Sequence, residues 1–88
     1  MTYFGHKVAI KCCFLSYNNL HLFSGARNGT LKCFNSLTGK EIYTFHDAHF
    51  DGVESCILTK DDNFLISASD DYTLKSWNLR VSREITTK

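Results

Sequence analysis

A histidine, a serine and an aspartate in the second half of the chain are the residue types that could together perform acyl transfer. In serine hydrolases a histidine takes the proton of the serine hydroxyl, and an aspartate orients the histidine. His49, Ser67 and Asp71 supply these three residue types. Ser67, however, is flanked by residues that favour a strand, and no G-x-S-x-G turn surrounds it. We therefore predict a structural role for the three residues and expect that the chain is not an enzyme.

The four cysteines, at positions 12, 13, 33 and 56, are the other residues with reactive side chains. They form no C-x-x-C pair, and Cys12 and Cys13 are adjacent, so that on a strand they would point to opposite sides. We therefore expect neither a disulfide framework nor a metal site, and we predict no cofactor.

The start of the chain and its hydropathy favour a location inside the cell. Residues 1–7 lack the basic and then apolar pattern of a signal peptide, and no apolar stretch approaches the ~20 residues that span a bilayer. We predict an intracellular protein, cytoplasmic or nuclear, in a reducing compartment and without a membrane partner.

Composition and charge are those of a folded domain. Of the 88 residues, 43% are hydrophobic and 14% are aromatic, which argues against a disordered segment. The net charge of +1, without a run of lysines or arginines, does not predict a nucleic-acid surface. The charge is uneven, with +4 over residues 1–46 and −3 over residues 47–88. This asymmetry is either a chance distribution over solvated faces or a sign that the halves lie beside complementary surfaces.

The elements that must position these side chains are short strands. Each half contains four segments rich in β-branched, aromatic or other apolar residues, separated by turn signals. The predicted strands span residues 8–14, 20–25, 30–34 and 41–45 in the first half, and 53–58, 64–69, 73–78 and 83–87 in the second. Asn28-Gly29 is predicted to form a two-residue hairpin turn in which both residues adopt positive φ.

The two halves repeat each other. A shift of 43 residues aligns the chain with itself without a gap, and 12 of the 41 positions from 5 to 45 are then identical. The shift places His6 on His49 and Ser24 on Ser67. A fixed period of this length indicates a repeat architecture, in which each unit buries its faces against its neighbours.

The chain resembles the WD-repeat family of β-propellers. The resemblance rests on the 43-residue period, on the four strands in each unit, on Gly5-His6 at the start of one unit and on Trp77-Asn78 at the end of a third strand. The most specific stretch spans residues 65–78. The resemblance implies an all-β fold of two four-stranded antiparallel blades, at residues 1–46 and 47–88.

The resemblance also implies that four hydrogen-bonded side chains hold a blade together. In the second unit these residues are His49, Ser67, Asp71 and Trp77. One closed network would satisfy a buried imidazole, carboxylate and indole, each of which is unfavourable to bury without a partner. The first unit keeps His6 and Ser24 but carries Asn28 and Phe34 where the pattern has aspartate and tryptophan. We therefore expect the first blade to be the less rigid.

Two blades cannot close a propeller, which needs typically 4–8 of them. Their uncovered apolar faces predict one of three arrangements: the chain is part of a longer propeller, it assembles with copies of itself, or it completes the propeller of another protein. The partners are then other proteins or further WD-repeat blades.

The function that the resemblance implies is that of a protein–protein interaction scaffold. The loops before the first strand and between the second and third strands would open on one face, where we predict partner contacts. The candidate residues on this face are Lys7, Arg27, Phe50, Asp51, Asp70 and Tyr72. Phe50 and Tyr72 are the predicted anchors, and the charged residues would set selectivity and association rate. The alternatives are a nucleic-acid-associated binding module and a propeller fragment with no independent function.

Overall fold

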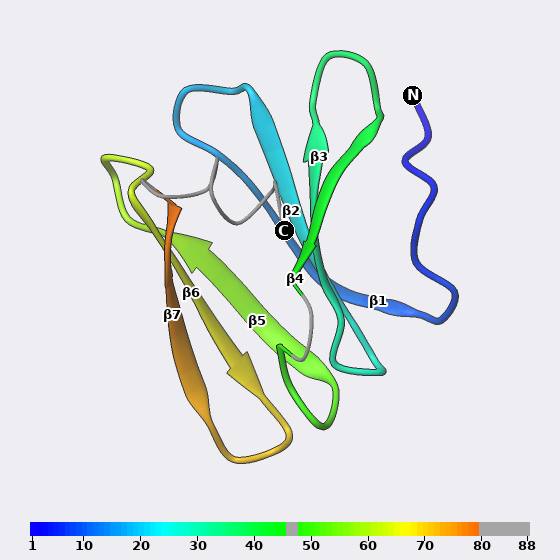
Figure 1. Ribbon diagram of the computed structural model, residues 1–88, viewed down its shortest axis with the longest axis vertical. Coiled ribbons are helices and arrows are strands. Elements are labelled where there is room, and N and C mark those ends of the chain that lie inside the picture. The colour runs from blue at the N-terminus through cyan, green and yellow to red at the C-terminus, as the bar shows by residue number, and fades with distance from the viewer. Residues whose placement is uncertain (46–47, 80–88) are drawn as a thin grey trace.

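The computed structural model describes residues 1–45 and 48–79, which form two antiparallel sheets (Figure 1). The strands of the first sheet are β1 (Ile10–Leu15), β2 (His21–Ala26), β3 (Leu31–Asn35) and β4 (Glu41–Phe45). The strands of the second sheet are β5 (Val53–Leu58), β6 (Phe64–Ser69) and β7 (Leu74–Asn78). Within each sheet, every strand pairs with the next one in sequence, so both sheets are meanders. The described residues include no helix that is long and apolar enough to cross a membrane.

The all-β architecture agrees with the prediction, and the strand boundaries agree closely. β4, β5 and β6 span the predicted residues, whereas the other strands start later by one or two residues. β2 starts at residue 21 because the Asn18 side chain still caps the preceding turn, with Oδ1 accepting the N–H of Leu20 at 3.0 Å. The predicted fourth strand of the second blade, residues 83–87, and the division between residues 46 and 47 lie outside the described residues.

The 43-residue repeat extends to irregularities of the backbone. A bulge interrupts the β1–β2 pairing between Ile10 and Cys12, and a second bulge interrupts the β5–β6 pairing between Val53 and Ser55, at the equivalent positions. A bulge adds one residue to a strand and bends it. The first strand of each blade is therefore shaped in the same way.

The turn between β2 and β3 differs from the predicted one. Only Gly29 adopts positive φ, at +88°, and Asn28 does not. The N–H of Gly29 donates to the carbonyl of Ala26 at 3.1 Å, and the N–H of Ala26 donates to the carbonyl of Thr30 at 2.9 Å. This is a three-residue connection that ends in a glycine bulge, so the prediction of two positive φ angles is wrong. Asn28 instead uses its side chain, whose Oδ1 accepts the N–H of Thr30 at 3.2 Å.

The hydrophobic core lies between the two sheets. Its buried residues come from both blades and are Phe23, Leu31, Cys33, Phe45, Ala48, Val53, Cys56, Leu58 and Leu65. The rings of Phe45 in β4 and Trp77 in β7 pack edge to face across the interface, with centroids 5.3 Å apart. The two blades therefore form one packed unit, in which β1 and β2 of the first blade contact β5 of the second.

Candidate functional site

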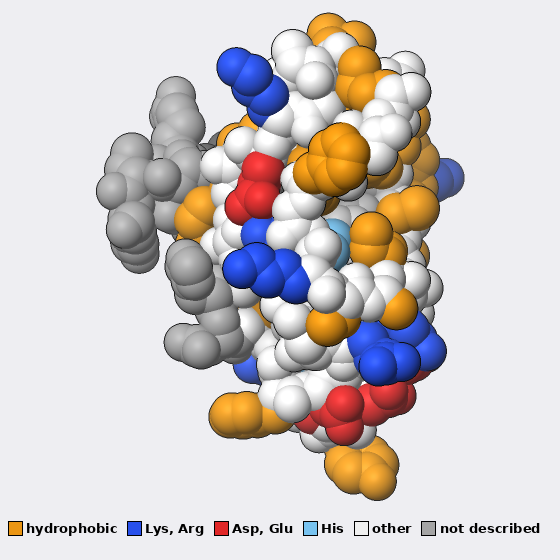
Figure 2. Space-filling model, turned by 90° about the vertical axis from the view of Figure 1, so that its right-hand side faces the viewer, with side chains coloured by type: hydrophobic (Ala, Val, Ile, Leu, Met, Phe, Trp, Pro, Cys, Tyr) orange, Lys and Arg blue, Asp and Glu red, His pale blue; other side chains and the backbone are white. Residues whose placement is uncertain are grey.

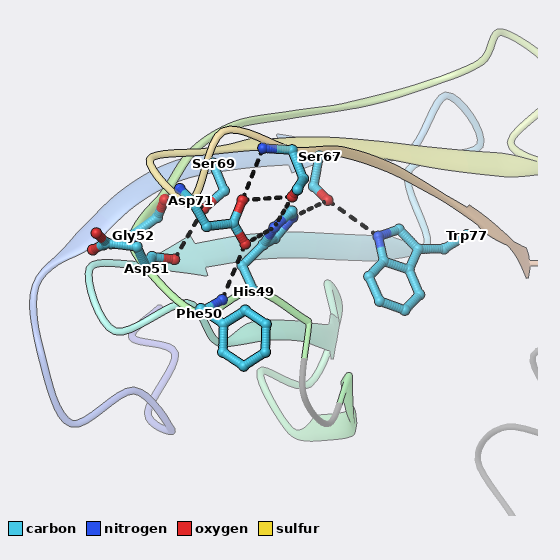
Figure 3. A network of polar contacts seen from close by, with 9 residues as sticks. His49, Phe50, Asp51, Gly52, Ser67, Ser69, Asp71 and Trp77 are labelled. Atoms are coloured by element: carbon cyan, nitrogen blue, oxygen red, sulfur yellow. Dashed lines mark hydrogen bonds and ion pairs between the residues drawn. The ribbon is translucent and has the colours of Figure 1, made fainter.

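The second blade brings together the four side chains that the sequence singled out there (Figure 3). Nε2 of His49 lies 2.7 Å from Oγ of Ser67, and Nδ1 of His49 lies 3.0 Å from Oδ2 of Asp71. The indole N–H of Trp77 donates to the same Ser67 oxygen at 3.1 Å. His49 comes from the segment before β5, Ser67 from β6 and Trp77 from β7. The hydrogen-bonded set therefore joins the entry segment to two strands of the blade.

Two further groups belong to this network and were not predicted. The hydroxyl of Thr73 lies 3.1 Å from His49 Nδ1 and donates to Asp71 Oδ1 at 2.5 Å. The backbone N–H of Phe50 donates to Asp71 Oδ2 at 3.0 Å. The sequence carried a signal for Thr73, because an aspartate two residues before a threonine favours a side-chain turn. Asp71 consequently connects the β6–β7 turn to the loop that carries Phe50.

The hydrogen bonds that Asp71 accepts determine its ionisation. Burial raises the pKa of this carboxyl, but hydrogen bonds from the Thr73 hydroxyl, the Phe50 N–H and His49 outweigh burial. The pKa of Asp71 therefore lies well below its usual 3.8. Asp71 is an anion at neutral pH, and its charge is held beside the imidazole of His49.

The geometry does not place Ser67 as a nucleophile. Ser67 is fully buried, and its oxygen is already in contact with the indole of Trp77 and the imidazole of His49. A nucleophilic serine needs access to a substrate carbonyl. No group of three or more His, Cys, Asp or Glu side chains within residues 1–45 and 48–79 could hold a metal ion. The arrangement supplies hydrogen bonds that hold a blade and a loop, and its serine hydroxyl is buried among them.

The equivalent positions in the first blade form a smaller set. Nε2 of His6 lies 2.5 Å from Oγ of Ser24, as in the second blade. Phe34 is buried, and the ring of Tyr3 packs against its edge with centroids 5.6 Å apart. Burial and the nearby charge of Lys32 lower the pKa of His6, against a smaller opposing effect of Glu41. Apolar packing of Phe34 thus takes the place of the indole, and the exposed Asn28 stands where the second blade has the carboxylate.

The predicted partner face consists of exposed residues on adjoining loops. All six candidate residues are solvent-exposed, and they are Lys7, Arg27, Phe50, Asp51, Asp70 and Tyr72. The backbone N–H of Arg27 donates to the carbonyl of Ala9 at 2.9 Å, and that of Asp70 donates to the carbonyl of Gly52 at 2.9 Å. In each blade the entry loop is therefore hydrogen-bonded to the hairpin turn beside it. In Figure 1 the β2–β3 turn, the loop before β5 and the β6–β7 turn lie toward the lower end of the molecule, where hydrophobic and charged side chains project side by side (Figure 2).

Two aromatic side chains project from this face without cover. Phe50 is 98% exposed and Tyr72 is 101% exposed. Tyr72 also has positive φ, at 71°, at the position where the first blade has Gly29. A residue with a Cβ pays about 1–2 kcal/mol for this conformation. The Tyr72 side chain buries no surface, and its backbone conformation is unfavourable for a residue with a Cβ. A tyrosine at this position therefore does not stabilise the fold.

Acidic side chains lie beside the two aromatic residues. Their surroundings include an ion pair that the sequence did not predict, between Lys11 and Glu54. Lys11 on β1 forms an ion pair with Glu54 on β5, with 3.4 Å between Nζ and Oε2. A hydrogen bond with Glu54 raises the pKa of Asp70, with further contributions from burial and from the charges of Glu54 and Asp51. Asp51, Glu54 and Asp70 thus form an acidic group on the second blade, next to basic residues of the first.

Comparison with known proteins extends these findings. The family model described as "WD domain, G-beta repeat" matches residues 1–35 and 39–78. The chain is 34% identical over 77 residues to U3 small nucleolar RNA-associated protein 12 of Saccharomyces cerevisiae, covering 88% of this chain and 8% of that protein. It is 31% identical over 84 residues to telomerase protein component 1 of Rattus norvegicus, covering 92% of this chain and 3% of that protein. The chain therefore spans less than a tenth of the length of these two relatives.

A solved structure shows the same fold. The crystal structure of RRP9 WD40 repeats superposes with a TM-score of 0.86 at 17% sequence identity, covering 91% of this chain and 26% of that one. At this identity the similarity concerns the fold. The fold of the two meanders is thus that of WD40 repeats.

Proposed function

The chain belongs to the WD-repeat family, and from this premise we propose that it is a protein–protein interaction scaffold whose partner binds the loops that carry Phe50 and Tyr72. One observation carries the proposal: two aromatic side chains are almost fully exposed on one face, and one of them has a strained backbone. Backbone strain persists where function requires the residue, and aromatic residues are favoured as binding anchors.

The polar network of the second blade supports this proposal because it holds the aromatic residues in place. Asp71 accepts the backbone N–H of Phe50 and is the chain neighbour of Tyr72. His49, which contacts Asp71, is the chain neighbour of Phe50. A binding surface on a rigid support loses less conformational freedom when the partner binds. We infer that the network serves the binding face as well as the blade.

The charges on the face favour a partner of a particular chemistry. Asp51 and Asp70 lie next to the aromatics, and the pKa of Asp70 is raised because Glu54 is close. A lysine or arginine of a partner would relieve this repulsion. We propose that the partner offers an apolar pocket for Phe50 and Tyr72 and basic side chains for the acidic group, which would accelerate association at low salt.

The free faces of the two blades support a second part of the proposal, namely that further blades cover them. Val53 in β5 is fully buried, whereas its equivalent in β1, Ile10, is 53% exposed. Leu31 in β3 is fully buried, whereas its equivalent in β7, Leu74, is 75% exposed. Equivalent positions are therefore buried where the two blades face each other and exposed on the outer faces of the two blades. We propose residues 1–46 and 47–88 as two blades of a larger ring, formed with other blades or with copies of this chain.

The names of the relatives favour a location for the complex. One is named as associated with a small nucleolar RNA, and the other as a component of telomerase. We propose that the protein is intracellular, and nuclear in particular, and that it is one subunit of a larger assembly.

A matched pair of variants tests the partner face. Phe50→Ala combined with Tyr72→Ala should reduce capture of specific partners by at least tenfold, because two anchors are removed. Leu37→Ala is the control, because Leu37 is 70% exposed on the β3–β4 turn, away from this face (Figure 1). Affinity capture with quantitative mass spectrometry measures the effect, and circular dichroism checks the fold. Unchanged capture by the folded double variant, or equal loss in the control, would contradict the proposed face.

A further inference from the structure

Two cysteines from different blades meet between the sheets. Sγ of Cys12 in β1 lies 3.5 Å from Sγ of Cys56 in β5, and it lies 3.6 Å from the carbonyl oxygen of Val53. The two residues are 44 positions apart in sequence and belong to the first strands of the two blades. Cys56 is buried, and Cys12 is partly exposed. Nothing in the sequence pattern brought these two residues together.

The local backbone makes room for this contact. The β1 bulge adds Lys11 between two paired residues, and Cys12 pairs with Gly25 directly after it. A Cβ at position 25 would lie 2.8 Å from Cys12 Sγ and 2.6 Å from a methyl group of Val53. The equivalent residue in the second blade is Ala68. Only the absence of a side chain at position 25 lets Cys12 and Val53 approach each other at this place.

The environments of the two sulfur atoms give them different roles. The hydrogen bond with Cys56 lowers the pKa of Cys12, against an opposing effect of burial. The same hydrogen bond and burial raise the pKa of Cys56. Thiolate, rather than thiol, is the nucleophile in cysteine chemistry. Cys12 is therefore the accessible, more acidic sulfur, and Cys56 is the protected thiol beside it.

From this geometry we propose that Cys12 and Cys56 are a redox modification site, at which a peroxide reversibly forms a disulfide that ties the first blade to the second. The Cys12 thiolate attacks hydrogen peroxide, which becomes Cys12 sulfenic acid and hydroxide. The Cys56 sulfur then attacks the Cys12 sulfur, the S–O bond breaks, and the Cys56 proton leaves with the hydroxyl group as water. Overall, two thiols lose two electrons and two protons, and one peroxide becomes two waters.

The disulfide requires a small movement. A disulfide has an S–S distance of about 2.05 Å, so the sulfur atoms must approach by roughly 1.5 Å. Rotation of the Cys12 side chain, which is partly exposed, supplies this more readily than movement of the buried Cys56. The bond would then close a loop of more than forty residues and fix the packing of β1 on β5.

Intact-mass spectrometry of the full chain, treated with hydrogen peroxide and compared with the reduced form, tests the proposal. We expect a loss of two hydrogen atoms, and a Cys12–Cys56 linked peptide after proteolysis without reductant. A thiol reductant should restore the mass. Cys12→Ser should abolish the change, and Cys13→Ser should leave it intact, since Cys13 is an exposed neighbour on the same strand.

A stability measurement separates the disulfide from other oxidation products. The oxidised wild-type chain should melt about 10 °C higher than the reduced one, and the Cys12→Ser variant should show no such difference. The serine variant remains informative because position 12 is partly exposed, so its replacement should not unfold the chain. Oxidation confined to Cys13, or disulfides only between separate chains, would overturn the proposal.

Discussion

The two blades carry the same histidine and serine at equivalent positions, but different chemistry completes each pair. In the second blade, Asp71 and Trp77 join His49 and Ser67 in one hydrogen-bonded network. In the first blade, His6 and Ser24 contact each other at 2.5 Å, and a buried phenylalanine takes the place of the tryptophan. Both blades still form meanders with a bulge at the same position. The complete network is therefore not required to form the sheet.

What distinguishes the second blade is the loop that leads into it. Asp71 accepts the backbone N–H of Phe50, whereas the side chain of Asn28 in the first blade accepts the N–H of Thr30, within its own turn. The carboxylate thus connects two loops of the candidate partner face, whereas among residues 1–45 and 48–79 the Asn28 amide contacts its own hairpin. The comparison indicates that the network is specialised for holding a surface loop, in addition to the strands.

The largest expected effect concerns the hairpin turns, where the blades differ most. A Cβ at Gly29 would lie 2.2 Å from the carbonyl oxygen of His49, and φ at Gly29 is +88°. We expect Gly29→Ala to lower the free energy of unfolding by at least ~2 kcal/mol, because the left-handed conformation and the clash act together. Tyr72→Gly, at the equivalent position, should change it by no more than about 1 kcal/mol. Urea denaturation measures both, and equal losses would show that the two turns are not distinct.

An intermediate effect is expected for the aromatic residues of the third strands. Trp77→Phe removes the indole N–H that Ser67 accepts, and we expect a loss of about 1–3 kcal/mol. Phe34→Leu only reduces apolar packing and should cost about 1 kcal/mol. Chemical denaturation of the two variants in the same assembly gives the difference. A smaller loss at Trp77 than at Phe34 would refute the stabilising role of the network.

The smallest effect is a dependence on pH that belongs to the second blade. The pKa of Asp71 in the folded protein lies below its usual 3.8, so folding favours the carboxylate. The resulting stability is present above about pH 4 and decreases as the pH falls toward the folded pKa. Asp71→Asn should therefore melt at a lower temperature than wild type at pH 7, and the gap should narrow at pH 3. If the difference in melting temperature did not change with pH, Asp71 would stabilise the blade through its shape and hydrogen bonds and not through its charge.

The repeat made most of the fold predictable from sequence. The strands at residues 41–45, 53–58 and 64–69 follow the predicted bounds, because alternating apolar residues flanked by turn residues leave little choice of register. The turn at Asn28-Gly29 was predicted wrongly, because the dipeptide suits two hairpin types. The close approach of the His49 carbonyl to Gly29, which the sequence does not reveal, accompanies the observed type.

The candidate site was predictable in its members and less so in its connections. The local spacing of Asp71 and Thr73 signalled their mutual hydrogen bond, but the contact of Thr73 with His49, 24 positions away in sequence, was missed. The ion pair between Lys11 and Glu54 was missed because it crosses from one blade to the other. Both contacts depend on how the entry segment and the neighbouring blade lie against the sheet, which no local pattern encodes.

The sequence by itself determined the all-β class, the 43-residue unit and the order of the strands, because these depend on side-chain alternation and on turn residues close in sequence. Only the tertiary structure decided that Cys12 lies beside Cys56, that Asp71 holds the Phe50 loop, and that Tyr72 has a strained backbone. The physical reason is the packing of one blade on another and of the entry loop on the hairpin turn. This packing brings into contact residues that are more than twenty positions apart in sequence, and it depends on how the two surfaces fit together.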